Sequence, residues 1–502
     1  MADAHFRTRL TAPATPLKHF WEHTVGSCHA PLALRADWQA QLARCRRQLG
    51  FRHVRFHGLL CDDLGTCVEH DGCLLDSFFN ADALVDFLLS IGVRPFVELS
   101  FMPEALASGT DTIFHYRANV TPPRDPHAWA SLVRRLAAHW VERYGAEEVR
   151  RWYFEVWNEP NLRAFWTGSQ EDCFTLYRHT ATVLKEVDAG LRVGGPATAK
   201  NEWVTEFLDF CGRERLPADF VSTHHYPNDP LWSEAQDTES ELAGSQRGIL
   251  AEWAAETHRR ARGVPLLYTE WNVSSNPRYP RQDDPYAAAF AVKSVLEVSG
   301  LVEAYSFWTF TDIFEENYLP SVPFHGGFGL LNLHGIPKPT YRAFELLHRL
   351  GDEQLPVEGK HETVDAWAVR GGSQLVILLT NHALPRQPIA TRQVRVEIDA
   401  APSPRGVTLE QIDEDRANPK AEWRRMGSPE YLRQGDVERI EEASRLRAEA
   451  QAWRYEEGCV SVEVELPPHG VAALTVEFAP GPLAGRPLTT LTAEPPLPSP
   501  HG

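Results

Sequence analysis

The sequence predicts an α/β fold, a (β/α)8 barrel of the TIM type joined to a C-terminal β-sandwich, and three observations support this. Between about residues 15 and 350, eight short β-like runs alternate with amphipathic helical segments. Polar residues gather at the carboxyl ends of these runs, the face on which barrels of this type build their sites. After about residue 350 the hydrophobic period changes from helical to two.

The barrel strands are predicted from apolar, β-branched and aromatic runs bounded by turn residues. They are residues 23–27, 53–57, 94–101, 151–157, 192–196, 219–225, 266–271 and 304–310. Among the helices between them, the clearest has Trp129, Leu132, Leu136 and Trp140 at steps of three and four, a core-facing stripe. A doubly wound sheet also alternates strands and helices, but it usually needs fewer strands. The barrel, residues 15–350, is therefore the predicted catalytic domain.

The C-terminal part is predicted to be a β-sandwich over residues 351–479. Residues 364–369 and 375–379 flank a Gly-Gly-Ser turn, and residues 393–398 and 460–466 alternate apolar with polar side chains. A charged segment at about 421–453 is predicted to be a helical insertion. Residues 1–14 form an N-terminal segment expected to join the sandwich. Residues 480–502, dense in Pro, Gly and Thr, are expected to be an extended or disordered tail.

Composition and charge exclude several classes of function. A net charge of -18 disfavours nucleic acid and anionic membranes as main partners, and no apolar run is long enough to span a bilayer. The N-terminus lacks a basic region followed by an apolar stretch, so we expect no signal peptide and a cytoplasmic protein. The eight Cys residues fit no common zinc spacing and are expected to be reduced thiols. Fifteen Trp residues would suit sugar rings, although most Trp belongs to cores.

Two strand ends carry the predicted chemistry. The run 151–157 leads into Asn158-Glu159-Pro160, and Pro160 prevents the strand from continuing. The run 266–271 carries Glu270 near its end, followed by Trp271 and an amide. These are the fourth and seventh predicted strands, so both carboxylates project to one mouth. Hydrolysis of a glycosidic bond needs such a pair, one protonated to assist the leaving oxygen and one ionised to attack or to activate water.

With these motifs in place, the chain resembles glycoside hydrolase family 39, and within it the bacterial β-xylosidases. Further matching runs cover about residues 15–478: 55–60, 101–109, 119–123, 308–310, 314–316, 324–329 and 336–340. The resemblance implies a retaining exo-β-1,4-xylosidase that releases xylose from the non-reducing ends of short xylo-oligosaccharides. It implies no metal and no organic cofactor, and a small oligosaccharide as the partner.

The resemblance also implies roles for single residues. Glu159 would be the general acid/base and Glu270 the nucleophile, with carboxyl groups roughly 5 Å apart. Asn158 would bond the sugar 2-hydroxyl, and Tyr226 would bond the nucleophile with His224 close by. The remaining expected substrate-binding residues are His57 for ring hydroxyls, Phe114 and Trp308 as apolar walls, and Glu315 or Glu316 as a further hydroxyl acceptor.

Several alternatives stay open at this point. His57 and Trp308 also fit a barrel core, and Glu315, Glu316 and the acidic pairs 62–63 and 283–284 also fit caps or surface charges. An α-L-iduronidase would need a pocket cation for the substrate carboxylate, and Arg117 is the nearest candidate. A side activity on β-glucosides or α-L-arabinopyranosides is compatible with the same site.

A non-catalytic carbohydrate-binding protein would be expected to have lost one of the two glutamates. Trp271 and His225 depart from the usual family pattern and bear on the leaving-group side. Oligomeric state and chain-length preference do not follow from the sequence.

Overall fold

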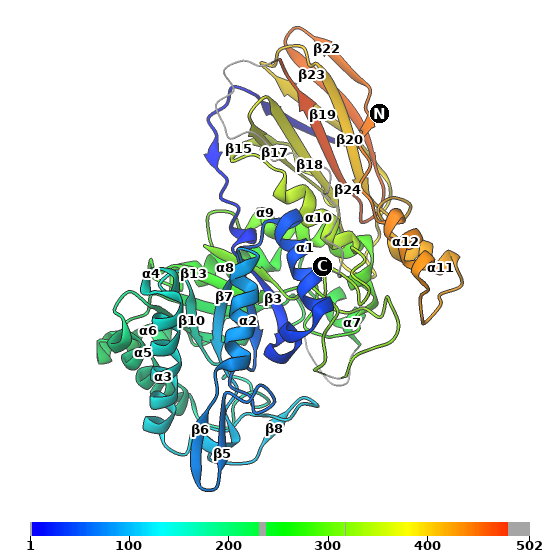
Figure 1. Cartoon of the computed structure of the whole chain (residues 1–502). Coiled ribbons are helices and arrows are strands. Elements are labelled where there is room, and N and C mark those ends of the chain that lie inside the picture. Colours follow the sequence, from blue (N-terminus) through cyan, green and yellow to red (C-terminus); the bar gives the residue numbers. More distant parts are fainter. Residues whose placement is uncertain (1–2, 230–236, 317, 480–502) are drawn as a thin grey trace.

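The computed structural model describes residues 3–229, 237–316 and 318–479, and the predicted tail at 480–502 lies outside them. Eight parallel strands close into a barrel in the order β10-β11-β12-β13-β14-β3-β4-β7 (Figure 1). Their bounds are β3 Thr24–His29, β4 His53–His57, β7 Arg94–Leu99, β10 Tyr153–Val156, β11 Arg192–Thr198, β12 Phe220–His225, β13 Leu266–Trp271 and β14 Ala304–Phe307. All eight predicted strands are present, and the predicted barrel is confirmed.

One principal helix follows each barrel strand and packs outside it. These helices are α1 Ala36–Leu49, α2 Phe79–Ser90, α3 Pro126–Tyr144, α5 Gln170–Val187, α6 Val204–Glu214, α8 Ile249–Arg260, α9 Pro285–Glu297 and α10 Pro339–His348, with the short α4 Ala146–Val149 and α7 Thr238–Ala243 between them. Capping residues determine where several helices begin. Asp125 caps α3 ahead of a Pro in its first turn, and Ser169 and Asp172 form a capping box on α5. The predicted apolar stripe of α3 is buried.

The second domain is a sandwich of two sheets. One has the order β16-β1-β19-β23-β22 and the other β2-β15-β17-β18-β24-β20-β21. Their strands are β1 Ala4–Arg9, β2 Thr15–Pro16, β15 Glu353–Leu355, β16 Val357–Glu358, β17 Val364–Gly371, β18 Gln374–Asn381, β19 Arg392–Asp399, β20 Gly406–Ile412, β21 Glu449–Ala450, β22 Trp453–Glu456, β23 Cys459–Leu466 and β24 Val471–Glu477. Val394, Val396 and Ile398 of β19 are buried between the sheets while their neighbours face outward, as the period of two requires.

The sandwich packs on the barrel through α9 and α10, which contact β18, β24 and β20 (Figure 1). Two short helices, α11 Pro419–Arg425 and α12 Gln434–Ala443, project from the sandwich within the segment predicted to be helical. On the barrel, hairpins β5 Cys67–His70 with β6 Cys73–Asp76 and β8 Thr112–Ile113 with β9 Ala118–Asn119 extend from the loops after β4 and β7.

One minor expectation is wrong. Asp283 is fully buried, because Lys338 pairs with both Asp283 at 2.7 Å and Asp312 at 2.6 Å. Asp283 and Asp312 also accept the backbone N–H groups of Gly326 and Gly329. A lysine 55 positions along the chain cannot be paired with Asp283 from sequence pattern alone. Asp284 occupies the N-cap position of α9, but its carboxylate contacts Lys420 rather than the helix.

All eight Cys residues lie in the described part of the chain, and all are free thiols. Among the described residues, no helix has the length and apolar character that crossing a membrane requires.

Candidate active site

The predicted catalytic carboxylates meet at the carboxyl mouth of the barrel. Glu159 follows β10, the fourth barrel strand, and Glu270 lies near the end of β13, the seventh. The chain turns sharply after β10, because Trp157 and Glu159 have φ angles of 70° and 44°. Such left-handed backbone is unfavourable for side chains larger than Gly and is concentrated at functional sites. The Glu159 amide is tied to the carbonyl of Ala197 at 2.8 Å, which fixes the turn.

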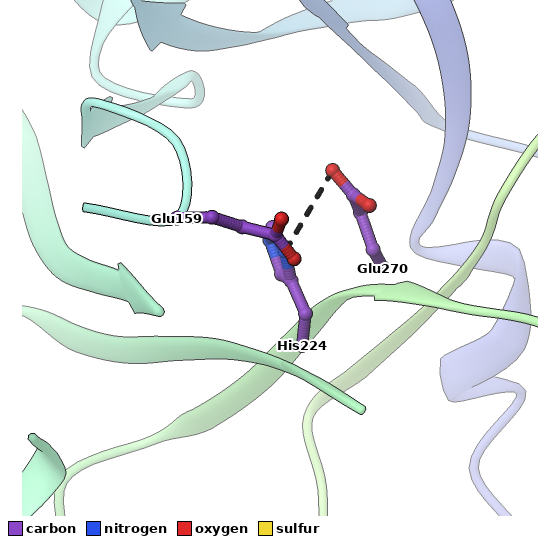
Figure 2. Close-up of side chains that lie close together, drawn as sticks. All are labelled: Glu159, His224 and Glu270. Carbon is purple, nitrogen blue, oxygen red and sulfur yellow. Dashed lines mark hydrogen bonds and ion pairs between the residues drawn. The ribbon is translucent and has the colours of Figure 1, made fainter. Parts of the chain in front are cut away.

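The side chains of Glu159 and Glu270 approach one another from two sides of the site, and the His224 ring lies beside the Glu159 carboxyl group (Figure 2). One oxygen of Glu159, one oxygen of Glu270 and one ring nitrogen of His224 all lie within 4.8 Å of each other. His224 Nδ1 is 2.9 Å from Glu159 Oε1 and 3.7 Å from Glu270 Oε1. Carboxyl groups about 5 Å apart suit a retaining glycosidase, whereas an inverting enzyme needs about 6.5–9.5 Å to admit a water molecule.

A fully buried arginine organises the floor of the site. Arg55, in the middle of β4, donates from Nη1 to Glu270 Oε1 at 2.7 Å and from Nε to Glu155 Oε2 at 2.6 Å. Its Nη2 donates to Asn158 Oδ1 at 2.9 Å and lies 2.8 Å from Glu98 Oε2. One guanidinium thus holds three carboxylates and the predicted sugar-binding amide in a fixed arrangement.

The two catalytic candidates have opposite surroundings. Glu270 receives Arg55 on one oxygen and the Tyr226 hydroxyl, at 2.9 Å, on the other. Two such donors stabilise an ionised carboxylate. The Glu159 carboxyl group contacts His224 Nδ1, and among the described residues it accepts no hydrogen bond from an arginine. Burial raises its pKa to about 7, although the positive charges of His57 and Arg55 oppose the rise. Glu159 is therefore the group that can hold a proton at neutral pH.

The two histidines of the site, His224 and His57, have pKa values shifted in opposite directions. Burial lowers the pKa of His224 to about 4, so this ring is neutral at neutral pH. His57 lies against Glu98, with Nδ1 2.8 Å from Oε2. Burial lowers the pKa of His57, but the charge and hydrogen bond of Glu98 outweigh it, and the net shift is upward. The surroundings of His57 thus favour its protonated form, whereas those of His224 favour the neutral ring.

Aromatic rings and Glu316 line the side of the site near His57. The Trp308 and Phe114 ring centroids lie 4.8 and 6.5 Å from that of His57. Gly26 leaves the space for Trp308, since a Cβ there would lie 2.4 Å from the indole Cε3. Glu316 Oε1 is 3.7 Å from His57 Nε2, and burial raises the pKa of Glu316 to about 8.

Glu315 is the one predicted residue directed elsewhere. Its carboxylate lies 3.4 Å from Nδ1 of the buried His29, whose Nε2 contacts Asp63 at 3.0 Å. Glu315 thus braces the loop after β14 against the loop after β4. The other nine predicted residues are brought together around the mouth.

Sequence reasoning assigned no role to four residues of this network, although it placed Glu98 among the polar residues at the strand ends: Arg55, Glu98, Glu155 and Thr269. Arg55 and Glu155 are charged residues inside apolar strands, which is a detectable signal of a buried ion pair. Thr269 carried no such signal. A β-bulge places Thr269 and Glu270 together opposite His224, so their side chains share the barrel interior although they are neighbours in sequence.

Glu159, His224 and Glu270 also form the group of described residues whose donor atoms are close enough to hold a metal ion. The Arg55 guanidinium already pairs with Glu270 at 2.7 Å, and a bound cation would face that charge across the same carboxylate. This set fits proton transfer better than metal binding.

Comparison with known proteins shows the family to which the chain belongs. The sequence model of Glycosyl hydrolases family 39 matches residues 7–460. The chain is 48% identical over 467 residues to a β-xylosidase of Caldicellulosiruptor saccharolyticus, covering 92% of this chain and 96% of that protein. It is 36% identical over 480 residues to a β-xylosidase of Geobacillus stearothermophilus, covering 92% and 93%.

Among solved structures, the GH39 enzyme of Xanthomonas axonopodis pv. citri superposes with a TM-score of 0.84 at 33% identity, covering 95% of this chain and 98% of that one. Family match, sequence identity and whole-chain superposition agree, and the chain belongs to glycoside hydrolase family 39.

Proposed function

We propose that this protein is a retaining exo-β-1,4-xylosidase acting on short xylo-oligosaccharides, with Glu159 as acid/base and Glu270 as nucleophile. The observation that carries the mechanism is a pair of glutamates with one oxygen of each within 4.8 Å of the other, one carboxylate bound by two donors and one whose pKa is raised by burial to about 7. The substrate assignment is supported by family relatives that are β-xylosidases at 48% and 36% identity.

In the first step Glu270 attacks the anomeric carbon while Glu159 protonates the departing oxygen. The C1–O bond to the leaving sugar breaks, a C1–O bond to Glu270 forms, and the Glu159 proton leaves with the alcohol. The Tyr226 and Arg55 donors aim Glu270 and restrain its rotation. Two carboxyl groups suffice for this chemistry.

In the second step Glu159, now ionised, removes a proton from water as the water attacks C1 and releases Glu270. Esterification has removed the negative charge of Glu270, so Glu159 no longer faces a like charge and can act as a base. Asn158 accepts from Arg55 through Oδ1, which leaves its NH2 group to donate to the sugar 2-hydroxyl in both transition states.

The non-reducing xylose is assigned to the side of the site built by His57, Glu316, Trp308 and Phe114. Charged and neutral hydrogen-bonding groups there alternate with ring faces, as a pyranose with equatorial hydroxyls requires. Discrimination against a β-glucoside rests on one hydroxymethyl group, so weak side activity on glucosides or α-L-arabinopyranosides is expected.

Neither arginine considered for the α-L-iduronidase alternative is placed to bind a substrate carboxylate. Arg117, the nearest candidate in the sequence, is exposed on the β8–β9 hairpin. Arg55 is committed to Glu98, Glu155 and Glu270. A purely carbohydrate-binding role leaves the opposite environments of Glu159 and Glu270 without a purpose.

The test is hydrolysis of 4-nitrophenyl β-D-xylopyranoside by wild type, Glu270→Ala and Glu159→Ala, each with and without azide. Azide should restore Glu270→Ala and yield the α-xylosyl azide, and it should restore Glu159→Ala and yield the β-xylosyl azide. As a matched control, Glu303→Ala removes an exposed glutamate and should behave as wild type. Absence of wild-type activity on the xyloside, with activity on the corresponding glucoside or iduronide, would reject the substrate assignment.

A further inference from the structure

A hydrogen-bonded chain runs from the barrel floor to the acid/base glutamate. Arg55 Nε donates to Glu155 Oε2 at 2.6 Å, and the other oxygen of Glu155 accepts from Thr269 Oγ1 at 2.8 Å. Thr269 Oγ1 lies 3.1 Å from His224 Nε2, and His224 Nδ1 lies 2.9 Å from Glu159 Oε1. Glu155, Thr269 and His224 are fully buried, so protein atoms rather than bulk water decide the proton positions.

One arrangement of hydrogen atoms satisfies all the hydrogen bonds in this series. A threonine hydroxyl has a single proton, and Thr269 gives it to Glu155, which Arg55 holds as an acceptor. Thr269 can therefore only accept from His224, which places the imidazole proton on Nε2. The ring is neutral, since burial lowers its pKa to about 4. Its Nδ1 then carries a lone pair directed at Glu159.

The alternative tautomer would have a different effect on catalysis. His224 Nδ1 is 2.9 Å from Glu159 Oε1 and 3.7 Å from Glu270 Oε1, so a proton on Nδ1 would stabilise negative charge on both carboxylates. Glu159 would then lose its proton at lower pH and be a poorer acid for unactivated leaving groups. A lone pair on Nδ1 instead accepts from protonated Glu159 and favours the form that the first step needs.

We propose that Thr269, braced by Glu155, is a positioning residue that fixes the Nε2–H tautomer of His224 and thereby keeps Glu159 protonated until substrate is cleaved. The proposal rests on the assignment of Glu159 as the acid/base. It predicts a function for the bulge in β13, which brings the Thr269 hydroxyl beside Glu270 on the interior face.

The experiment compares wild type with Thr269→Val, which keeps the shape and removes the hydroxyl, and with Thr269→Ser, which restores it. The pH dependence of kcat/KM is measured on xylobiose, whose leaving group needs protonation, and on 4-nitrophenyl β-D-xylopyranoside, whose leaving group needs less. Thr269→Val should move the alkaline limb on xylobiose down by roughly half to one pH unit, as the change of one hydrogen bond implies. The xyloside should be affected less, and Thr269→Ser should match wild type.

Thr223→Val is the matched control, because Thr223 adjoins His224 on the same strand but its buried hydroxyl donates to the carbonyl of Thr198. Its alkaline limb should stay at the wild-type position. An unshifted limb in Thr269→Val, or an equal loss at every pH and on both substrates, would overturn the proposal.

A second measurement needs no variant of Thr269. The ¹⁵N resonances of His224 in wild type, identified by their loss in His224→Gln, should show a protonated Nε2 and an unprotonated Nδ1 at pH 6.5–7. A protonated Nδ1 would overturn the proposal even if the protein is an active xylosidase. Failure of wild type to cleave either xyloside would instead reject the proposed function and leave the tautomer measurement valid.

Discussion

The Tyr226 hydroxyl donates to Oε2 of Glu270 at 2.9 Å, and Arg55 occupies the other oxygen of the same carboxylate. Arg55 lies in β4 and Tyr226 directly follows β12, so the two donors reach different oxygens of the nucleophile from separate parts of the barrel. Neither oxygen of Glu270 is therefore free to rotate away from the anomeric carbon. The position of the nucleophile depends on both contacts.

Removal of the Tyr226 hydroxyl should slow the reaction without unfolding the protein. We expect Tyr226→Phe to lower kcat on 4-nitrophenyl β-D-xylopyranoside by roughly 10- to 1,000-fold, the range for one preorganised donor at a reacting centre. Tyr305→Phe is the control, because that buried hydroxyl contacts His225 and not a catalytic carboxylate. Steady-state kinetics measure kcat for both variants. An equal loss of kcat in Tyr226→Phe and Tyr305→Phe would assign the effect at Tyr226 to packing rather than to its hydrogen bond.

The protonation state of Glu159 should set the alkaline limb of activity. Burial raises its pKa to about 7, and the acid form is the active one in the first step, so kcat/KM should fall as pH rises through about 7. Glu159→Gln cannot ionise and should lose this limb. Its residual activity should be greatest on aryl xylosides with good leaving groups. A limb that persists in Glu159→Gln would assign the titration to another group, such as Glu316, whose pKa is raised to about 8.

The buried cluster of Lys338 with Asp283 and Asp312 should matter for stability. Lys338→Met leaves two buried carboxylates without their cation, and such a loss costs about 3–5 kcal/mol of unfolding free energy. Lys18→Met removes a lysine that pairs with Glu303 in solvent and should change stability by less than about 1 kcal/mol. Urea unfolding measures the stability of both variants. Similar unfolding midpoints for Lys338→Met and Lys18→Met would contradict a stabilising role for the buried cluster.

Acid should destabilise the fold through His23 and His53, which stack together at the amino-terminal ends of β3 and β4. His23 and His53 stack with ring centroids 4.7 Å apart, and burial lowers the pKa of His53 to about 4 and that of His23 well below its usual value. The unfolded chain binds protons at these sites from about pH 6.5 downward while the folded protein does not. Above about pH 6.5 these two histidines are neutral in both states and do not lower the free energy of unfolding. As pH falls toward 4, proton binding by the unfolded chain lowers the free energy of unfolding, by on the order of 3 kcal/mol for His53.

Thermal unfolding between pH 7.5 and 4.5 measures this loss. A His53→Gln variant should show a shallower pH dependence than wild type. His5→Gln alters an exposed ring and should leave the slope unchanged. Parallel curves for wild type and His53→Gln would contradict the assignment.

The strands, the two carboxylates and most of the mouth were predictable because each depends on local pattern. An apolar run stopped by Pro160 marks the end of β10 whatever the rest of the chain does. The connection of Arg55 to Glu155 and Glu270 was not predictable, since it joins positions 100 and 215 residues apart.

Two further features depend on details that the sequence pattern does not contain. Strict alternation along β13 would place Thr269 on the face opposite Glu270, and the bulge reverses this. The choice between Glu315 and Glu316 was also open, because both lie in a loop whose course is set by distant contacts of His29 and His57.

The first strand of the chain, β1, belongs to the C-terminal sandwich. β1 pairs with β16 and β19 inside the sandwich, and Arg7 joins Asp399 across 392 positions of sequence. During synthesis on the ribosome, β1 therefore emerges long before β16 and β19, and it can pair with them only after the whole barrel has been synthesised. No single cut of the polypeptide separates the barrel from a complete sandwich, and an N-terminal deletion past residue 9 removes from the sandwich the strand that pairs with both β16 and β19.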